Sequence, residues 1–160
     1  MNSISVQYSS SEYRIFAPKE KVIAFLKKVC EHEGLDKVQF SVSFIDEENM
    51  RFLNKTYRGI DNSTDILSFA VQDGNDDFDF PTGRSRYRNL GDMLICPEVC
   101  MRNASDFGVE SKEELHRLLI HGILHLKGMD HVSNDADEPM LMHQEDILKK
   151  LYLIQQGGLL

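Results

Sequence analysis

The sequence has no long hydrophobic run. None of its 160 residues belongs to an apolar stretch near the roughly 20 residues that a membrane-spanning helix needs. The apolar run 118–126 contains two histidines and is bounded by Arg117 and Lys127. The opening segment MNSISVQYSSSEYR lacks the basic start and apolar core of a signal peptide. We therefore expect a cytoplasmic protein without a membrane partner.

An excess of positive charge is absent as well. Lys and Arg number 18 against 26 Asp and Glu, which gives a formal net charge of −8. This sign argues against nucleic-acid binding through general basicity, so a nucleic-acid partner would need a local basic patch. The cysteines, Cys30, Cys96 and Cys100, are odd in number. They fit small hydrophobic reduced thiols better than a disulfide framework.

The composition that remains is that of one globular domain. Apolar residues make up 41% of the chain and charged residues 28%, with no repeat or linker, so we predict a single α+β domain over 1–160 around a small sheet. The patterns predict strands over 4–8, 13–16, 38–45, 66–71 and 90–96, and helices over 19–33, 47–55, 97–106, 112–127 and 136–155.

Local sequence signals add detail to this prediction. Asp46 is expected to cap the helix 47–55, and Ser111 to start the helix 112–127 through a capping box with Glu114. A long polar connection, 72–89, carries alternating arginines, which could form a phosphate-contacting patch or a solvated loop: Arg84, Arg86 and Arg88.

Histidines concentrate in the segment HGILHLKGMDH. His121 and His125 are four residues apart on a predicted helix, so both rings lie on one face. The helix is expected to end at Gly128, which allows His131 to return to the same ion. Three histidines leave a fourth position for water or substrate, as in catalytic zinc sites, where zinc lowers the pKa of a bound water to about 7. The alternative is three unrelated histidines.

Other histidines fit this site less well. His116 lies about 140° away around the helix, and His143 is on another predicted helix and stays open as a ligand. The spacing also matches the zinc-protease motif H-E-x-x-H-x-x-G-x-x-H, except that Gly122 replaces the glutamate that acts as the base. The pattern therefore predicts a metal site at the end of a long helix and the following turn, without that base. Nickel, copper or iron would also suit three histidines.

The segment HGILHLKGMDH resembles the signature H-G-x-L-H-L-x-G-x-D-H of the YbeY family, zinc-dependent endoribonucleases of ribosomal RNA maturation. The segments LNKTYRGIDNSTDILSF, 53–69, and LGDMLICPEV, 90–99, are similar to further blocks of that family. The resemblance covers about residues 40–150, and the closing helix fits it at Met140, Gln144, Glu145 and Ile147.

This resemblance implies an α+β fold with a small mixed sheet packed with helices, and one Zn²⁺ held by His121, His125 and His131. It implies that Arg58 engages an RNA phosphate. The implied activity is hydrolysis of single-stranded RNA, in maturation of the 3′ end of the small-subunit ribosomal RNA and in ribosome quality control. The ribosome or ribosomal proteins are the implied partners.

Three aspartates could support the metal ligands. Asp65 and Asp92 could each orient a histidine, although a structural role is favoured for both, and Asp130 could be a histidine partner or a turn former. Met140 could pack beneath the metal, but plain core packing is favoured. Two other functions stay open: a zinc peptidase of the metzincin type, which Gly122 argues against, and a non-catalytic ribosome-assembly factor whose zinc serves folding.

Overall fold

The computed structural model describes residues 1–71 and 86–157. Its elements follow one another along the chain as β1 (Ser3–Tyr8), α1 (Tyr13–Phe16), α2 (Lys19–His32), β2 (Val38–Phe44), α3 (Glu47–Arg58), β3 (Ile66–Ala70), β4 (Arg88–Ile95), α4 (Pro97–Phe107), α5 (Ser111–Leu126), α6 (Pro139–Leu148), the π-helical turn η2 (Lys149–Leu153) and α7 (Ile154–Gly157). No helix in the described ranges is long and apolar enough to cross a membrane.

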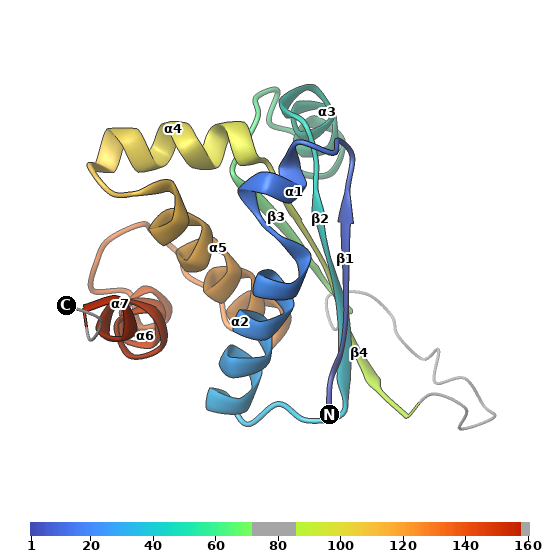
Figure 1. Cartoon of the computed structure of the whole chain (residues 1–160). Helices are drawn as coiled ribbons and strands as arrows, with labels where there is room; N and C mark the ends of the chain where they lie inside the picture. Colours follow the sequence, from blue (N-terminus) through green and yellow to red (C-terminus); the bar gives the residue numbers. More distant parts are fainter. Residues whose placement is uncertain (72–85, 158–160) are drawn as a thin grey trace.

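The four strands of the described chain form one mixed sheet in the order β1-β2-β4-β3. Strands β1, β2 and β4 are parallel, and β3 pairs with β4 antiparallel. Along β2 buried residues alternate with half-buried ones, so one face of the sheet is covered more fully than the other. Figure 1 shows α2, α5 and α6 on the same side of the sheet, with α3 at one end. The predicted α+β class with a mixed sheet is confirmed.

The helix α5 is the centre of the packing. It contacts β3 and β4 on the sheet side and α2, α4 and α6 on its other sides. Most of its apolar residues are buried, among them Leu119, Ile120, Ile123 and Leu124, at 1% exposure or less. A helix held from several sides is a rigid support, so side chains on it keep fixed positions.

Some predicted elements need correction. The predicted strand 13–16 is the one-turn helix α1, because Tyr13 turns inward while Ile15 is 85% exposed, which is not the alternation of a strand. The helix α5 begins at Ser111, after Glu110 at the N-cap position, which makes no side-chain cap. Glu114 is buried beside Arg117, so the predicted capping box does not form.

Other local predictions are confirmed. Asp46 caps α3 by accepting a hydrogen bond from the Asn49 backbone N–H at 2.8 Å. This helix runs three residues further than predicted, to Arg58, and ends at Gly59 in the left-handed conformation. The cysteines are free and buried, and burial raises the pKa of the Cys30 and Cys96 thiols to about 11.

Two further segments differ from their predicted bounds. The last predicted helix, 136–155, begins only at Pro139 and passes through the π-helical turn η2. The polar connection was predicted to extend to residue 89, but β4 already begins at Arg88. Arg84 lies outside the described residues, so the arginine patch stays a prediction.

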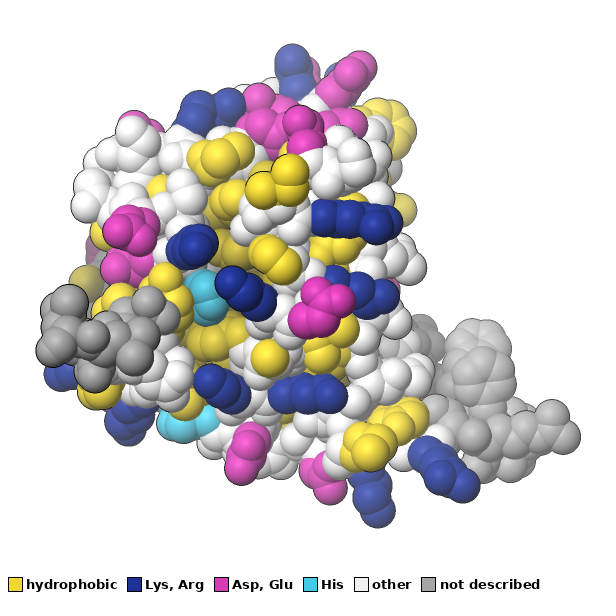
Figure 2. Space-filling model, in the orientation of Figure 1, with side chains coloured by type: hydrophobic (Ala, Val, Ile, Leu, Met, Phe, Trp, Pro, Cys, Tyr) yellow, Lys and Arg dark blue, Asp and Glu magenta, His cyan; other side chains and the backbone are white. Residues whose placement is uncertain are grey.

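A hollow of about 440 Å³ lies between α2 and α5. Figure 2 shows hydrophobic side chains on this face of the molecule with Lys and Arg side chains around them. The hollow is lined in part by Lys21, Lys28 and Lys112. It also holds His116, whose ring stacks on Tyr152 at 4.0 Å between centroids. His116 therefore packs away from the other α5 histidines, as predicted.

Candidate metal centre

The end of α5 brings three histidine rings together. After Leu126 the chain reverses, with the Gly128 N–H bonded to the His125 carbonyl and the Met129 N–H to the Leu124 carbonyl. This reversal returns His131 to the helix. The ring centroids of His121 and His125 are 4.6 Å apart, and His131 lies 5.4 and 5.7 Å from them. One ligand nitrogen from each ring lies within 4.8 Å of the other two, so the triad could hold one metal ion.

Hydrogen bonds orient two of these rings. His121 Nδ1 donates to Gln144 Oε1 at 2.6 Å, and His131 Nδ1 donates to the backbone carbonyl of Ser133 at 2.7 Å. A carbonyl oxygen can only accept, so the proton of His131 is on Nδ1. In both rings Nε2 is left with its lone pair for a metal ion.

The protonation state of the triad also suits a metal. Burial lowers the pKa of His121, although the hydrogen bond to Gln144 opposes the shift. Burial and the neighbouring His121 lower the pKa of His125 to about 4. Only neutral imidazole binds a metal, so these rings do not have to lose a proton first at neutral pH. The three converging rings, two of them held in the required tautomer, fit an ion.

The described residues add no fourth side-chain ligand to this group. His143 is instead bonded through Nε2 to Glu33, at 2.9 Å, and therefore does not face the triad. Structural zinc sites usually have four protein ligands, whereas catalytic ones keep a position open. The geometry of the described residues is therefore that of a site that would leave one coordination position of an ion open.

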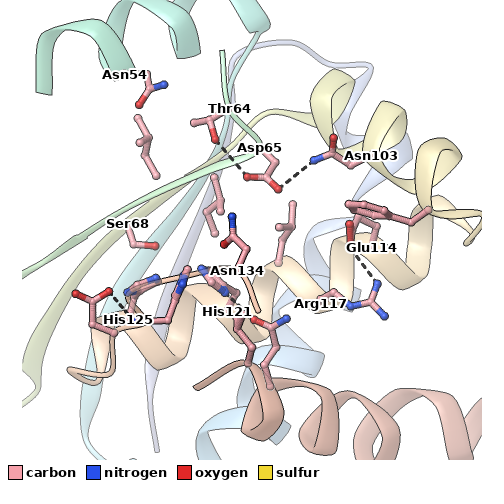
Figure 3. A pocket seen from close by; sticks show the side chains of 18 of the residues that line it. Asn54, Thr64, Asp65, Ser68, Asn103, Glu114, Arg117, His121, His125 and Asn134 are labelled. Atoms are coloured by element: carbon pink, nitrogen blue, oxygen red, sulfur yellow. Dashed lines mark hydrogen bonds and ion pairs between the residues drawn. The ribbon is translucent and has the colours of Figure 1, made fainter. Parts of the chain in front are cut away.

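The triad lies in a cleft of about 780 Å³. Its walls come from α3, the segment before β3, β3, α4, α5, the turn after α5, and α6, and Figure 3 shows many of the lining side chains. Of the predicted site residues, the cleft brings together Arg58, Asp65, Asp130, His121, His125 and His131.

Arg58 is the free cation of this cleft. It is exposed at the end of α3 and makes no hydrogen bond or ion pair with the residues that the structure describes. Arg117 also lines the cleft, but its guanidinium is bound to three carboxylates, those of Glu113, Glu114 and Glu145. An anionic substrate therefore finds an available guanidinium at Arg58 and not at Arg117.

The three aspartates differ in placement. Asp65 accepts hydrogen bonds from Asn103 at 3.2 Å and Thr64 at 3.4 Å, so its contacts are structural. The Asp130 carboxylate accepts from the His131 backbone N–H, which shapes the turn. Asp92 is exposed on β4, bonds to Ser41, and does not line the cleft, so the structure does not bring it to the triad.

Gly122 lies where α5 approaches the sheet. A Cβ at this position would come within 2.6 Å of Met93 Sδ and 3.2 Å of Ile66 Cδ1. Met93 is fully buried. The sequence showed that the protease glutamate is missing, and the packing adds that any side chain at this position would have to displace the buried end of Met93.

Sequence reasoning missed the partners of the histidines. Gln144 lies 23 residues from His121, and no spacing rule connects a helix to a residue on the next one. It missed Ser68 too, whose buried hydroxyl lines the cleft and has no hydrogen-bond partner among the described residues. Met140 is 1% exposed in the core, where packing was favoured.

Comparisons with known proteins identify the family of the chain. Residues 4–152 match the family model described as Endoribonuclease YbeY. The Endoribonuclease YbeY of Treponema denticola is 40% identical over 147 residues, 92% of each chain. That of Staphylococcus aureus strain MSSA476 is 36% identical over 138 residues, 86% of each chain.

A solved structure is similar over nearly the whole chain. The solution structure of TM1509 from Thermotoga maritima superposes with a TM-score of 0.63 at 25% identity. The match covers 97% of this chain and 93% of that one. The mixed sheet, the histidine cleft and these matches lead to one conclusion: the chain belongs to the YbeY family.

Proposed function

We propose that this protein is a zinc-dependent endoribonuclease that cleaves single-stranded RNA during ribosomal RNA processing. The observation that carries the proposal is the cleft in which three histidines with an open fourth position lie with an arginine that has no ion-pair partner in the described part of the chain. The relatives' shared name, Endoribonuclease YbeY, supports the reaction. Maturation of the 3′ end of the small-subunit ribosomal RNA and ribosome quality control are the proposed cellular roles.

Each residue of the site has a defined part in phosphodiester hydrolysis. His121, His125 and His131 would hold the ion, which supplies a Lewis acid with an open position for water or a phosphoryl oxygen. The Gln144 and Ser133 oxygens keep the His121 and His131 rings in the metal-binding tautomer. Arg58 binds the scissile phosphate and stabilises the negative charge that grows on it in the transition state.

The metal is proposed to be zinc because the donor set is three imidazole nitrogens. Metal analysis of the purified protein tests this identity. One equivalent of zinc per chain is expected, and a preference for nickel, copper or iron would contradict it.

The net charge of −8 affects how RNA reaches the site. An acidic protein gains little from counterion release, so tight autonomous RNA binding is not expected. We therefore propose that ribosomal proteins guide the substrate to the cleft, in the cytoplasm. Pull-down of assembling small subunits, with and without RNase treatment, would distinguish protein-mediated from RNA-mediated association.

The test compares purified, nuclease-free variants on single-stranded RNA. His125→Ala should lose the metal and the cleavage activity together. Arg58→Ala should keep the metal but lose about 10²-fold or more in kcat. The matched control is Arg51→Ala, because Arg51 is an exposed arginine on the same helix that pairs with Asp61 and does not line the cleft.

Specific outcomes contradict the proposal. A metal-free His125→Ala variant that still cleaves RNA would exclude metal-dependent chemistry, and equal cleavage by every variant would reveal a contaminating nuclease. Inactive wild type on all RNAs would favour the non-catalytic assembly factor. A casein assay tests the peptidase alternative, for which the buried Gly122 leaves no base.

A further inference from the structure

An exposed aromatic ring lies at the rim of the cleft. Phe107 is the last residue of α4, is 67% exposed and lines the same cleft as the histidine triad. Its backbone is fixed by the helix end that follows: Gly108 is left-handed, and the Val109 N–H bonds to the Ala104 carbonyl at 2.9 Å. A large apolar side chain is thus held in solvent at a defined place.

Polar groups surround this end of the cleft. Asn103 lies four residues before Phe107, on the same face of α4, and also lines the cleft. Its side-chain Nδ2 donates to Asp65, which leaves the amide oxygen free to accept. The buried Glu114 is bonded to Arg117 at 3.0 Å, so its charge is compensated. The cleft near Phe107 therefore offers a hydrogen-bond acceptor at Asn103, and the charge of Glu114 is balanced by Arg117.

The length of α5 gives the scale of the cleft. In Figure 3 Asn103, Glu114 and Arg117 lie on one side of the pocket and His125 on the other. Along α5, Glu114 is about 10 Å from His121 and about 16 Å from His125 at the helical rise per residue. An RNA strand with one phosphate at the triad would therefore place a nearby base at this end of the cleft.

We propose that Phe107 is a stacking platform for one unpaired nucleobase close to the scissile phosphate, with Asn103 facing the edge of that base. Single-stranded RNA is bound in this way by many proteins, because unstacked bases present their faces to aromatic side chains. A base inside a duplex cannot stack on Phe107, so this subsite selects an unpaired nucleotide. The inference rests on the proposed endoribonuclease function and assigns part of the substrate preference of the same cleft.

The experiment uses a short single-stranded RNA and a series in which one abasic nucleotide moves along the strand. Wild-type protein should lose about tenfold or more in kcat/KM at one position of the abasic nucleotide. Phe107→Ala should show that loss on intact RNA and no further loss at that position. Phe107→Trp should retain the wild-type pattern because it keeps an aromatic face.

Phe52→Ala is the matched control, since Phe52 is 65% exposed on α3 and does not line the cleft. It should behave as wild type. Metal content and melting temperature should not change in Phe107→Ala, because the removed ring is largely in solvent. Wild-type cleavage and an unchanged abasic profile in Phe107→Ala would overturn the stacking role while leaving the nuclease function intact.

A binding measurement keeps the inference testable even where no RNA is cleaved. RNA labelled with 2-aminopurine should show fluorescence quenching by wild-type protein at the position that stacks, and this quenching should be lost in Phe107→Ala. Quenching that is equal in the two proteins at every labelled position would contradict the platform. Absent cleavage by wild type together with Phe107-dependent quenching would contradict only the proposed reaction.

Discussion

His121 is oriented by a neutral amide. Metal-binding histidines often donate their second N–H to a carboxylate, which makes the ring more basic and strengthens the metal bond. Here the acceptor is Gln144, whose own Nε2 donates to Glu145 at 3.1 Å. The negatively charged carboxylate of Glu145 therefore contacts Gln144 and not the His121 ring. This arrangement fixes the tautomer of His121 with a neutral acceptor, so an ion bound there would keep more of its Lewis acidity than one bound by a histidine paired with a carboxylate.

Removal of this amide should weaken the metal site. We expect Gln144→Ala to reduce metal affinity about 10- to 100-fold, because His121 loses the acceptor that fixes its tautomer. Competition with a chromophoric chelator measures the affinity. Met142→Ala, an exposed substitution on the same helix, is the control. Equal affinities of wild type and Gln144→Ala would show that Gln144 does not orient the ring.

Local signals made part of the site predictable. Helical spacing relates His121 to His125, and Gly128 indicates where the chain reverses toward His131. By contrast, Asp92 sits in a sequence block that resembles the family as closely as the others, yet it lies on the exposed face of β4. The register of the sheet decides that placement, and register depends on neighbouring strands that are far apart in the sequence.

At the scale of elements, the predictions that are confirmed again depend on contacts between residues close in the sequence. Asp46 could be recognised as the α3 cap because the bond to Asn49 spans three residues. Residues 13–16 could not be assigned from the pattern YRIF alone. Tyr13 is turned inward by a tertiary contact, since its hydroxyl donates to Glu98 at 2.5 Å across 85 residues.

The pairing of β3 with β4 depends on one glycine. Gly91 has φ +124°, and a Cβ there would lie 2.0 Å from the Phe69 carbonyl oxygen. Backbone atoms cannot move aside cheaply, so we expect Gly91→Ala to lower the free energy of unfolding by about 3 kcal/mol or more. Urea denaturation followed by circular dichroism measures the change.

Gly34→Ala is the comparison for this prediction. Gly34 also has positive φ, at +69°, but no atom lies within 4 Å of the added Cβ. It should cost only about 1–2 kcal/mol, the conformational penalty for the left-handed region. A Gly91→Ala variant no less stable than Gly34→Ala would contradict the close approach of the two strands.

Glu33 links three helices. This carboxylate follows α2, its side chain is 3% exposed, and it binds Lys127 at the end of α5 and His143 of α6, as well as His32. Burial alone would raise the pKa of Glu33, but the bonds to the two histidines and the lysine outweigh it and lower the pKa to about 2.

This shift predicts a pH dependence of stability. A lowered folded-state pKa stabilises the protein above the unfolded value near 4.5, and the effect is lost as pH falls from there toward about 2. We expect Glu33→Gln to cost about 1–3 kcal/mol at pH 7, with the difference from wild type shrinking below pH 4.5. Urea titrations at several pH values measure it, and a difference that stays constant down to pH 2.5 would contradict the ionic contribution.

At the scale of the whole molecule, the metal site connects parts of the fold that are separate in sequence. The triad joins α5 to the turn after it, and Gln144 adds α6. Because the rings are already together, an ion should bind the folded chain far better than the unfolded one. Ligand binding of this kind stabilises by mass action, about 2.7 kcal/mol at a metal concentration 100-fold above Kd.

We therefore expect zinc to raise the Tm of wild-type protein, and EDTA to lower it, by about 5–10 °C. Differential scanning calorimetry in both conditions measures the shift. His125→Ala should melt at the same temperature with zinc and with EDTA, since it lacks a ligand. A large response of that variant would place the ion at another site.

The close packing of Gly122 against Met93 also bears on how this site differs from that of a zinc protease. The histidine spacing of this chain matches the zinc-protease motif except at the position of the general base, where Gly122 stands. On the motif alone, exchange of this one residue would therefore be enough to supply the base. Here the glycine lies against a buried methionine of β4. A glutamate at this position would require the Met93 side chain to move within the interface between α5 and the sheet. Introducing the general base of the zinc proteases here is therefore a matter of repacking this interface as well as of exchanging one residue.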